Sequence, residues 1–301
     1  MEIIKGKATW IDVVKKSQHD IDWIKQKFKI HPVILDELKG PSARSHVEHY
    51  DSYLYLVYQF PIFEEAKKVS RRSEVDFIIT KDTVITVHYE ELLPLAEFKK
   101  DLGRNAELKD RALSNTLLLA YNLLLALISF EERQLRHIQE KIEKVGVQLF
   151  KNREKYVLQE ISYLKPDLSE YRIIIRPQEH LLKSFLDTGL DFWGKSARVY
   201  LNDLIGDHLR LTDQIEDYRE ALEDFEDTNN QLISIKNTEV TKTFTILAFL
   251  TFPLMLFSAL FTIGAKGTPL VDRPGAFWII LAIMVAAMAG MYSYFKKKEW
   301  L

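Results

Sequence analysis

The sequence predicts an α+β cytoplasmic domain, with a small mixed sheet and helices, followed by long helices, one of which continues into the membrane. Three observations predict this fold class. Aromatic and β-branched runs lie in the first hundred residues, proline-poor stretches with helical periodicity follow, and two uncharged intervals lie near the C-terminus. Each interval is long enough to cross a hydrocarbon core of roughly 30 Å at about 1.5 Å per residue.

The first segment, residues 1–104, is expected to be an N-terminal α/β domain. Its strand candidates are rich in aromatic and β-branched side chains and comprise Tyr53–Phe60, Val75–Thr80 and Thr83–His88. The Lys81-Asp82 step between the last two predicts a tight hairpin turn. Ile21–Phe28 and Leu93–Leu102 are expected to form short helices.

Residues 105–242 are predicted to be a region of long cytoplasmic helices. Leu113 to Phe150 has apolar residues at helical spacing and no proline, which predicts one helix of some 40 residues. Pro166 and Pro177 are expected to break the helical region that follows, because proline removes a backbone donor. From about Ala197 a heptad-like apolar stripe enters the first uncharged interval without a turn signal. One continuous helix of about 65 residues, ending near Thr262, is therefore predicted.

The two uncharged intervals predict transmembrane helices at 243–265 and 274–295, joined by an extracellular loop at 266–273. The tail, residues 296–301, begins with three lysines, and positive flanks favour the cytoplasm. We therefore expect a multi-pass protein of the cell (inner or plasma) membrane with both termini in the cytoplasm. No signal peptide is recognised at the N-terminus. A pair of buried core helices is the alternative, but the second interval is apolar all round.

Composition excludes several classes of protein. The formal net charge is −2, with no basic excess typical of nucleic-acid binders, so no nucleic acid is expected as a partner. The absence of cysteine excludes disulfides, thiolate metal sites and cysteine nucleophiles. The sequence has no HExxH motif, Gly-rich phosphate loop or nucleophile elbow, so neither an enzyme nor an organic cofactor is expected. The charge is uneven, at −5 over residues 1–242 and +3 beyond them.

Several motifs resemble the CorA family of magnesium and other divalent cation channels. The N-terminal match is IHPVILDEL, from Ile30, and VEHYDSYLYLVY, from Val47 to Tyr58; Val84–His88 is similar to a family strand. The C-terminal match, TEVTKTFTILAFLTFPL, extends from Thr238 to Leu254. The resemblance covers nearly the whole chain. It implies two transmembrane helices, a homopentamer in the lipid bilayer, and Mg²⁺ or another divalent cation as substrate and regulator.

One family signature, Tyr-Gly-Met-Asn at the outer end of the first span, is absent. Counted from Pro253-Leu254, its place is taken by Phe261, Thr262, Ile263 and Gly264. In the family the asparagine amides form an outer ring that meets the hydrated ion, whereas Gly264 offers only its backbone. The loop carries Lys266, Asp272 and Arg273, a net +1 per chain that repels divalent cations. The resemblance therefore implies the fold and the pentamer more firmly than magnesium selectivity.

Two helices cannot enclose a polar path, so conduction requires several copies around an axis. A pore-lining face on the first span recurs every three or four residues and comprises Thr238, Thr241, Phe244 or Thr245, Ala248, Phe252, Met255, Ala259 and Thr262. Hydroxyl groups at the cytoplasmic end suit a hydrated cation. Phe252 and Met255 are expected to form a constriction that closes by dewetting. Ordinary helix packing is the alternative interpretation.

Two candidate metal sites lie outside the spans. Asp203 and Asp207 share a helix face, and the resemblance implies regulatory divalent cations near this position, between neighbouring subunits. A solvated face with Arg210 and Arg219 as partners is the alternative. His46, Glu48 and His49 can converge on a metal only if their backbone is not a regular strand.

The leading hypothesis is a CorA-like homopentameric channel or transporter for divalent metal cations, with Mg²⁺ first among them. A non-conducting membrane scaffold or regulator with the same fold is the alternative, favoured by the missing asparagine and the basic loop. A zinc or proton-coupled variant is a third hypothesis, which the sequence does not separate from the first.

Overall fold

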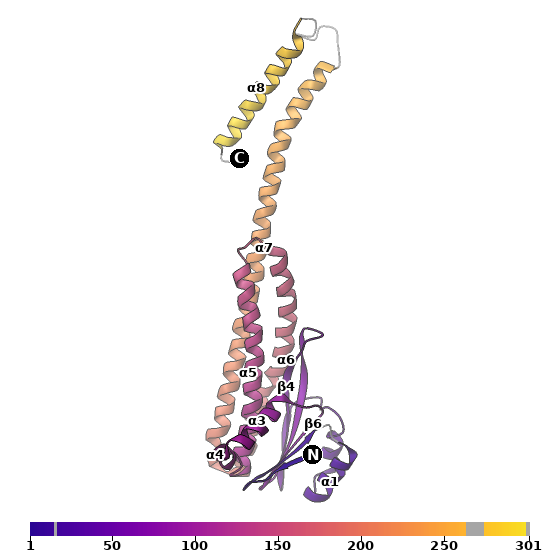
Figure 1. Cartoon of the computed structure of the whole chain (residues 1–301), viewed down its shortest axis with the longest axis vertical. Coiled ribbons are helices and arrows are strands. Elements are labelled where there is room, and N and C mark those ends of the chain that lie inside the picture. The colour runs from indigo at the N-terminus through magenta and orange to yellow at the C-terminus, as the bar shows by residue number, and fades with distance from the viewer. Residues whose placement is uncertain (15–16, 263–273, 299–301) are drawn as a thin grey trace. The chain divides into compact units, whose positions relative to one another are not determined.

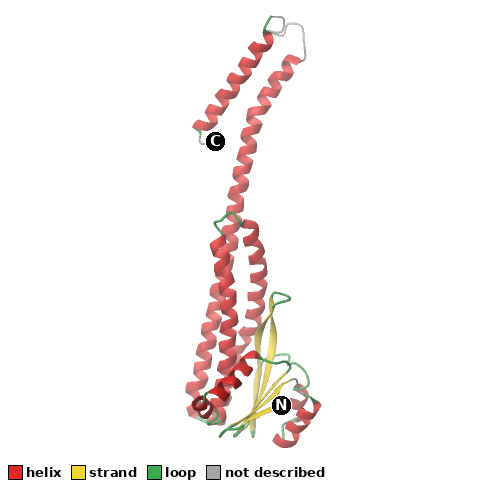
Figure 2. Cartoon of the chain, in the orientation of Figure 1, coloured by secondary structure: helices red, strands yellow, loops and turns green. Residues whose placement is uncertain are grey.

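The computed structural model describes residues 1–14, 17–262 and 274–298, and it has the predicted α+β class (Figures 1 and 2). The chain divides into two units, Met1–Glu226 and Asp227–Leu301. The division falls within one helix.

A six-stranded mixed sheet organises the first unit. Its strand order is β1-β2-β6-β5-β4-β3, with only β2 and β6 parallel among the described pairs. The strands are β1 Glu2–Ile4, β2 Thr9–Val14, β3 His46–Tyr50, β4 Tyr53–Glu64, β5 Val69–Ile79 and β6 Thr83–His88. The three predicted strands are confirmed, and the β4–β5 hairpin is longer than predicted because pairing continues to Glu64 and Val69. Strands β1, β2 and β3 were not predicted. Strand β1 has only three residues, and β3 is short and rich in polar residues.

The predicted hairpin turn at Lys81-Asp82 joins β5 to β6. The Thr80 backbone N–H donates to the Thr83 carbonyl over 2.8 Å, and the Thr83 N–H donates to the Thr80 hydroxyl over 3.0 Å. Both residues of the step therefore lie in a closed turn, and Ile79 pairs with Val84 directly beside it.

The sheet is covered by helices on both faces. In β4 the side chains of Leu54, Leu56 and Tyr58 belong to one apolar cluster, and those of Tyr55 and Val57 belong to the other. Helices α1 (Gln18–Phe28) and α2 (Pro32–Glu37) pack on the second cluster; α3 (Leu93–Arg104), α4 (Ala106–Ala112), α5 (Thr116–Gln148) and α6 (Glu154–Trp193) pack on the first. This strict alternation follows from the two-residue period of a strand. Each large apolar side chain buried in this way contributes about 1.5–3 kcal/mol.

The long helix predicted from Leu113 to Phe150 is confirmed as α5, which begins at Thr116. Its later start has a local cause. The Asn115 side chain accepts the Leu118 backbone N–H over 2.8 Å, and such a cap separates α5 from the short helix α4. The two helices meet at 115°.

The prediction that Pro166 and Pro177 break the next helical region is wrong. Both prolines lie inside α6, which is continuous from Glu154 to Trp193. Their rings are on the exposed side of the helix, where water can hydrate the carbonyl groups that lose a partner. The opposite side is buried by residues such as Leu168 and Ile175, and this packing outweighs the local cost of about 3 kcal/mol per proline.

A short 3-10 helix, η1 (Lys195–Ala197), follows Gly194, whose positive φ of 83° favours glycine. It leads into α7, Arg198–Thr262, which is the predicted uninterrupted 65-residue helix. The final helix, α8, extends from Ala276 to Lys297. Within the described residues, the end of α7 and α8 are long and apolar enough to cross a membrane as single helices. The bent pair of α4 and α5 also meets that test of composition, but the α5 leucines form the core of the first unit.

Candidate functional site

One face of the α7 membrane segment is directed at α8. Ile246 is buried, and Leu250, Leu254, Phe257 and Phe261 are half-buried at spacings of three and four residues. The neighbouring Phe249 ring lies 6.4 Å from that of Phe295, the buried residue near the end of α8. The helical period places these α7 side chains in one stripe, which is the internal packing face of the second unit.

The predicted pore stripe lies on the other side of α7. At 3.6 residues per turn its centre is roughly 180° from the packing face. Phe244, Phe252 and Met255 are 67%, 63% and 59% exposed. The remaining members are also exposed, except for the half-buried Ala248; they are Thr238, Thr241, Thr245, Ala259 and Thr262. The chain's own helices therefore leave the stripe available to lipid or to other copies of the chain.

Threonines on this stripe present oxygen lone pairs. The hydroxyls of Thr238, Thr245 and Thr262 donate to carbonyls four residues earlier, over 2.9, 2.8 and 2.8 Å. Because each hydroxyl proton is used within the helix, the oxygen faces outward as an acceptor, which suits a cation or its water. A groove of about 530 Å³ is lined by Ser234, Asn237, Thr238, Thr241, Lys242 and Thr245. Lys242 is a cationic member of that lining.

The family signature position is only partly described. Thr262 is the last residue of α7 and is exposed. Ile263 and Gly264, and the loop 266–273 with its basic side chains, lie outside the described residues. What replaces the missing asparagine ring therefore stays a sequence prediction.

The Asp203 and Asp207 carboxylates have partners within the chain. Tyr121 of α5 donates to Asp203 over 2.6 Å, and burial together with this contact raises the pKa of Tyr121 above its ordinary value. Asp207 pairs with Arg210, as the solvated-face interpretation expects, whereas Arg219 pairs with Glu216 and Glu223 instead. Among the described residues no three His, Asp or Glu side chains are placed to hold a metal ion. The regulatory cation stays a prediction that needs ligands from a second subunit.

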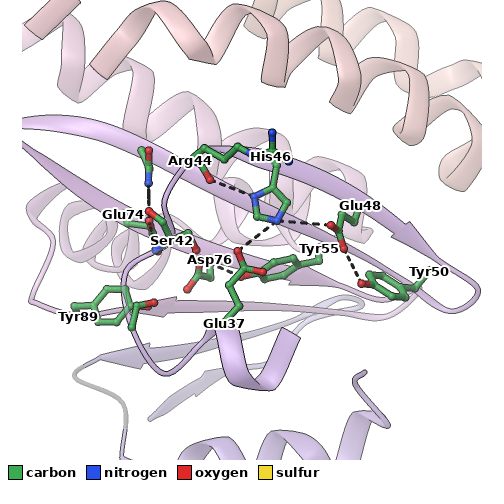
Figure 3. Close-up of polar contacts among 12 residues, drawn as sticks. Glu37, Ser42, Arg44, His46, Glu48, Tyr50, Tyr55, Glu74, Asp76 and Tyr89 are labelled. Carbon is green, nitrogen blue, oxygen red and sulfur yellow. Dashed lines mark hydrogen bonds and ion pairs between the residues drawn. The ribbon is translucent and has the colours of Figure 1, made fainter. Parts of the chain in front are cut away.

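The histidine cluster of β3 does not form the alternative metal site. The strand is regular, so His49 faces away from His46 and Glu48 and lies against the Phe192 ring. His46 Nε2 instead lies 3.5 Å from Glu37 Oε1 and 4.0 Å from Glu48 Oε1 (Figure 3). Glu37 comes from α2, and only the fold brings it to this strand.

The loop between α2 and β3 is anchored to the sheet by a buried carboxylate. The Ser42 backbone N–H lies 3.0 Å from both oxygens of Glu74 (Figure 3). Gln59 Nε2 donates to Glu74 over 2.9 Å. Tyr89 donates to the Gly40 carbonyl of the same loop. These contacts fix the position of Glu37 and His46 relative to β4 and β5.

Another buried cluster joins β2, β6 and α3. Asp12 Oδ1 lies 3.0 Å from His88 Nε2 and accepts from Thr86, and Asp12 Oδ2 accepts from Lys99 over 2.8 Å. Burial raises the pKa of Asp12, but the contacts with His88, Lys99 and Thr86 outweigh it, and the pKa lies below its ordinary value. The sequence offered no signal for this cluster, since Asp12 and His88 are 76 residues apart.

Comparison with known proteins gives a consistent family. The sequence profile described as CorA-like Mg²⁺ transporter protein matches residues 5–297. The chain is 24% identical over 294 residues to the cobalt/magnesium transport protein CorA of Thermotoga maritima, covering 97% of this chain and 83% of that protein. The protein of the same description from Methanocaldococcus jannaschii is 22% identical over 298 residues, covering 97% and 91%.

Solved structures share the fold. The complete CorA magnesium transporter from Methanocaldococcus jannaschii superposes with a TM-score of 0.85 at 20% identity, covering 100% of this chain and 94% of that one. The ZntB cytoplasmic domain from Vibrio parahaemolyticus superposes with a TM-score of 0.63 at 14% identity, covering 76% and 89%.

Proposed function

Because the chain belongs to the family of CorA-like Mg²⁺ transporter proteins, we propose that it is a homopentameric channel with Mg²⁺ as its main substrate. Members of the family carry divalent cations across membranes, so the protein is a membrane transporter of divalent cations and not an enzyme. The relatives named as cobalt/magnesium transport proteins make Co²⁺ a second substrate to test.

The uncovered stripe on α7 is the observation that carries the proposal. A face that is turned away from α8 and holds both hydroxyls and aromatic residues has two possible neighbours, lipid and another copy. Each hydroxyl oxygen keeps an unused acceptor lone pair, which water or a polar group of another copy satisfies and lipid does not. Five copies around an axis would then bring Thr238, Thr241 and Thr245 to a common inner mouth.

Phe252 and Met255 would narrow the pore further out. In a pentamer the five Phe252 side chains would form one apolar ring around the pore, and the five Met255 side chains a second. These rings would exclude water from a narrow pore and so stop a hydrated cation. Widening the pore re-admits water. The membrane potential would drive entry of cations, at about 2.3 kcal/mol per charge for each 100 mV.

We also propose that both termini are cytoplasmic in the cell membrane, with Lys296, Lys297 and Lys298 next to the inner surface. Regulatory Mg²⁺ would bind Asp203 and Asp207 together with groups of the neighbouring subunit. Binding there would require the Tyr121 and Arg210 contacts to be exchanged for metal contacts.

Ion flux through purified protein tests the channel proposal. The full chain is reconstituted in liposomes, and entry of Mg²⁺, Co²⁺, Zn²⁺ and Ni²⁺ is followed with trapped dyes under an imposed potential. Native mass spectrometry gives the number of copies in the same preparation. A pentamer with no flux of any cation would contradict conduction and favour the scaffold alternative.

The gate is tested with a matched pair of variants. Phe252→Ala is expected to raise Mg²⁺ flux several-fold, because it removes a ring from the constriction. Leu247→Ala is the control, since it trims an exposed side chain roughly 140° away around the helix. Equal flux in wild type and Phe252→Ala would remove Phe252 from the gate.

A further inference from the structure

A buried glutamate joins three elements of the first unit. Glu131 of α5, Tyr58 of β4 and Gln178 of α6 all have 0% exposed side chains. In the sequence, Tyr58 is 73 residues from Glu131 and 120 residues from Gln178. Tyr171 of α6 adds a fourth contact, since its hydroxyl donates to the Glu131 backbone carbonyl over 2.5 Å.

The orientation of the Gln178 amide is determined by an acceptor that cannot donate. Gln178 Nε2 lies 2.8 Å from the Gln59 backbone carbonyl and 2.7 Å from Glu131 Oε1. A carbonyl only accepts, so the amide nitrogen must face Gln59. Gln178 Oε1 therefore faces the Tyr58 hydroxyl, 3.0 Å away.

This cluster then has one hydrogen too few to satisfy its contacts if Glu131 is ionised. The Tyr58 hydroxyl oxygen lies 3.0 Å from Gln178 Oε1 and 3.2 and 3.4 Å from the two Glu131 oxygens, but it has a single hydrogen. If that hydrogen goes to Gln178, the contact between Tyr58 and Glu131 needs a proton on the carboxyl group. If the hydrogen goes to Glu131, the oxygens of Tyr58 and Gln178 face each other over 3.0 Å with no hydrogen between them.

We propose that Glu131 is a proton-binding site, and that the bound proton closes a ring of hydrogen bonds holding β4, α5 and α6 together. In this ring the Glu131 carboxyl O–H donates to Tyr58, Tyr58 donates to Gln178, and Gln178 donates back to Glu131. The second amide hydrogen of Gln178 goes to Gln59, so every hydrogen is used once. This inference concerns the cytoplasmic unit and does not depend on the proposed channel.

The surroundings of Glu131 favour the neutral form. The titratable groups that face it are Tyr58 from β4, Tyr171 from α6 and Glu132 from α5, none of them basic. Within the described part of the chain, no ion pair reaches Glu131. Burial raises the pKa of Glu131 to about 8, although the contacts with Gln178 and Tyr58 act in the opposite direction.

The pH dependence of the unit's stability follows from the difference between the pKa of Glu131 in the unfolded and the folded chain. In the unfolded chain the glutamate has a pKa near 4.5, and in the folded unit the pKa is about 8. Between these values the folded state holds one more proton, so opening of the unit becomes about tenfold more favourable for each pH unit. Above about pH 8 the effect of this group levels off.

Infrared spectroscopy of the full chain in detergent detects the proton directly. The carbonyl stretch of a protonated carboxylic acid is expected at pH 7 in wild type and absent from Glu131→Gln. It should also decline as the pH rises through about 8. Tyr58→Phe should keep the band at a shifted frequency, because the acid loses its hydrogen-bond acceptor, and Glu140→Gln, an exposed change on the same helix, should leave it unchanged. A wild-type spectrum at pH 7 that Glu131→Gln does not alter would overturn the proposal.

Hydrogen exchange gives the structural readout. Wild type and the control Glu140→Gln should both lose protection in α5 and α6 peptides, up to tenfold per unit between pH 6 and 8, and Glu131→Gln should not. If Glu131→Gln does not fold, Tyr58→Phe serves in its place and should keep the pH slope at lower overall protection. If protection falls with pH in the same way in wild type and Glu131→Gln, the proton site at Glu131 is contradicted. It is also contradicted if protection does not change with pH in wild type and Tyr58→Phe.

Discussion

The first half of α5 and the last third of α7 are both rich in leucine and phenylalanine, yet they have opposite surroundings. In α5 the side chains of Leu119, Leu123, Leu124 and Leu127 are 0% exposed, covered by the sheet and the other helices. In α7 Phe252 and Leu256 are 63% and 64% exposed. Apolar content alone would group the two segments, and even the bent pair of α4 and α5 meets a test for membrane spans.

The distribution of apolar residues around each helix makes the difference. Helix α5 has polar residues such as Asn122 and Arg133 on the sides that the core does not cover, so it is amphipathic. The end of α7 and all of α8 up to Phe295 have apolar residues on every side. An all-round apolar helix must be buried in protein or in lipid, and outside the face between α7 and α8 the described residues leave these helices largely exposed.

A matched pair of leucine truncations tests this contrast most strongly. Leu123→Ala is expected to cost about 2–5 kcal/mol, because it opens a cavity in a closed core. Leu256→Ala should change the stability in detergent by well under 1 kcal/mol, since detergent fills the space. The melting temperatures of the two variants measure the difference. Similar shifts in both would mean that the end of α7 is packed against protein in the assembled molecule.

The buried polar groups of the first unit give the next largest effect. Asp12→Asn removes the charge that Lys99 and His88 contact, and is expected to cost about 1–3 kcal/mol at pH 7. The pKa of Asp12 is lower in the folded than in the unfolded chain, so its stabilising effect is present above about pH 4 and disappears as the pH falls through the folded pKa.

Unfolding free energies at neutral and acid pH check this prediction. The gap between wild type and Asp12→Asn should shrink below pH 4. Glu107→Gln, on the exposed surface of α4, is a control that should show no gap at either pH. A gap that is constant with pH would assign the effect to packing and not to the charge.

The smallest expected effect concerns the carboxylates of α7 within the first unit. If Asp203 and Asp207 bind a regulatory cation, Asp203→Asn with Asp207→Asn should reduce the rise in melting temperature caused by Mg²⁺. Tyr121→Phe should increase that rise, because it frees Asp203 from a competing donor. An unchanged Mg²⁺ response in both variants would support the solvated-face interpretation.

Periodicity was the most informative property for predicting the fold. It predicted α5 and the full extent of α7, because each is a long run whose period of 3.6 is uninterrupted. The three main strands were predicted instead from their aromatic and β-branched residues. Local rules failed where packing outweighed them. Pro166 and Pro177 lie inside α6, and the short strands β1 and β3 form only because longer strands pair with them.

The candidate site was predictable to a similar degree. The stripe on α7 follows from the helical period and lies opposite the α8 face, and its role as a pore lining stays a prediction. The contacts of Asp203 with Tyr121 and of His46 with Glu37 were not predictable, since their partners lie far away in sequence. The same is true of the ring at Glu131, where no motif links Tyr58, Glu131 and Gln178.

The sequence by itself determined where apolar surface had to be covered: on both faces of the central strands, on one side of α5, and all around the membrane segments of the last two helices. This follows because backbone periodicity decides which side chains share a face. Only the tertiary structure decided which polar groups meet inside the first unit and how their protons are shared. Such contacts depend on the mutual placement of β4, α5 and α6, and a buried carboxyl group takes its charge from those neighbours.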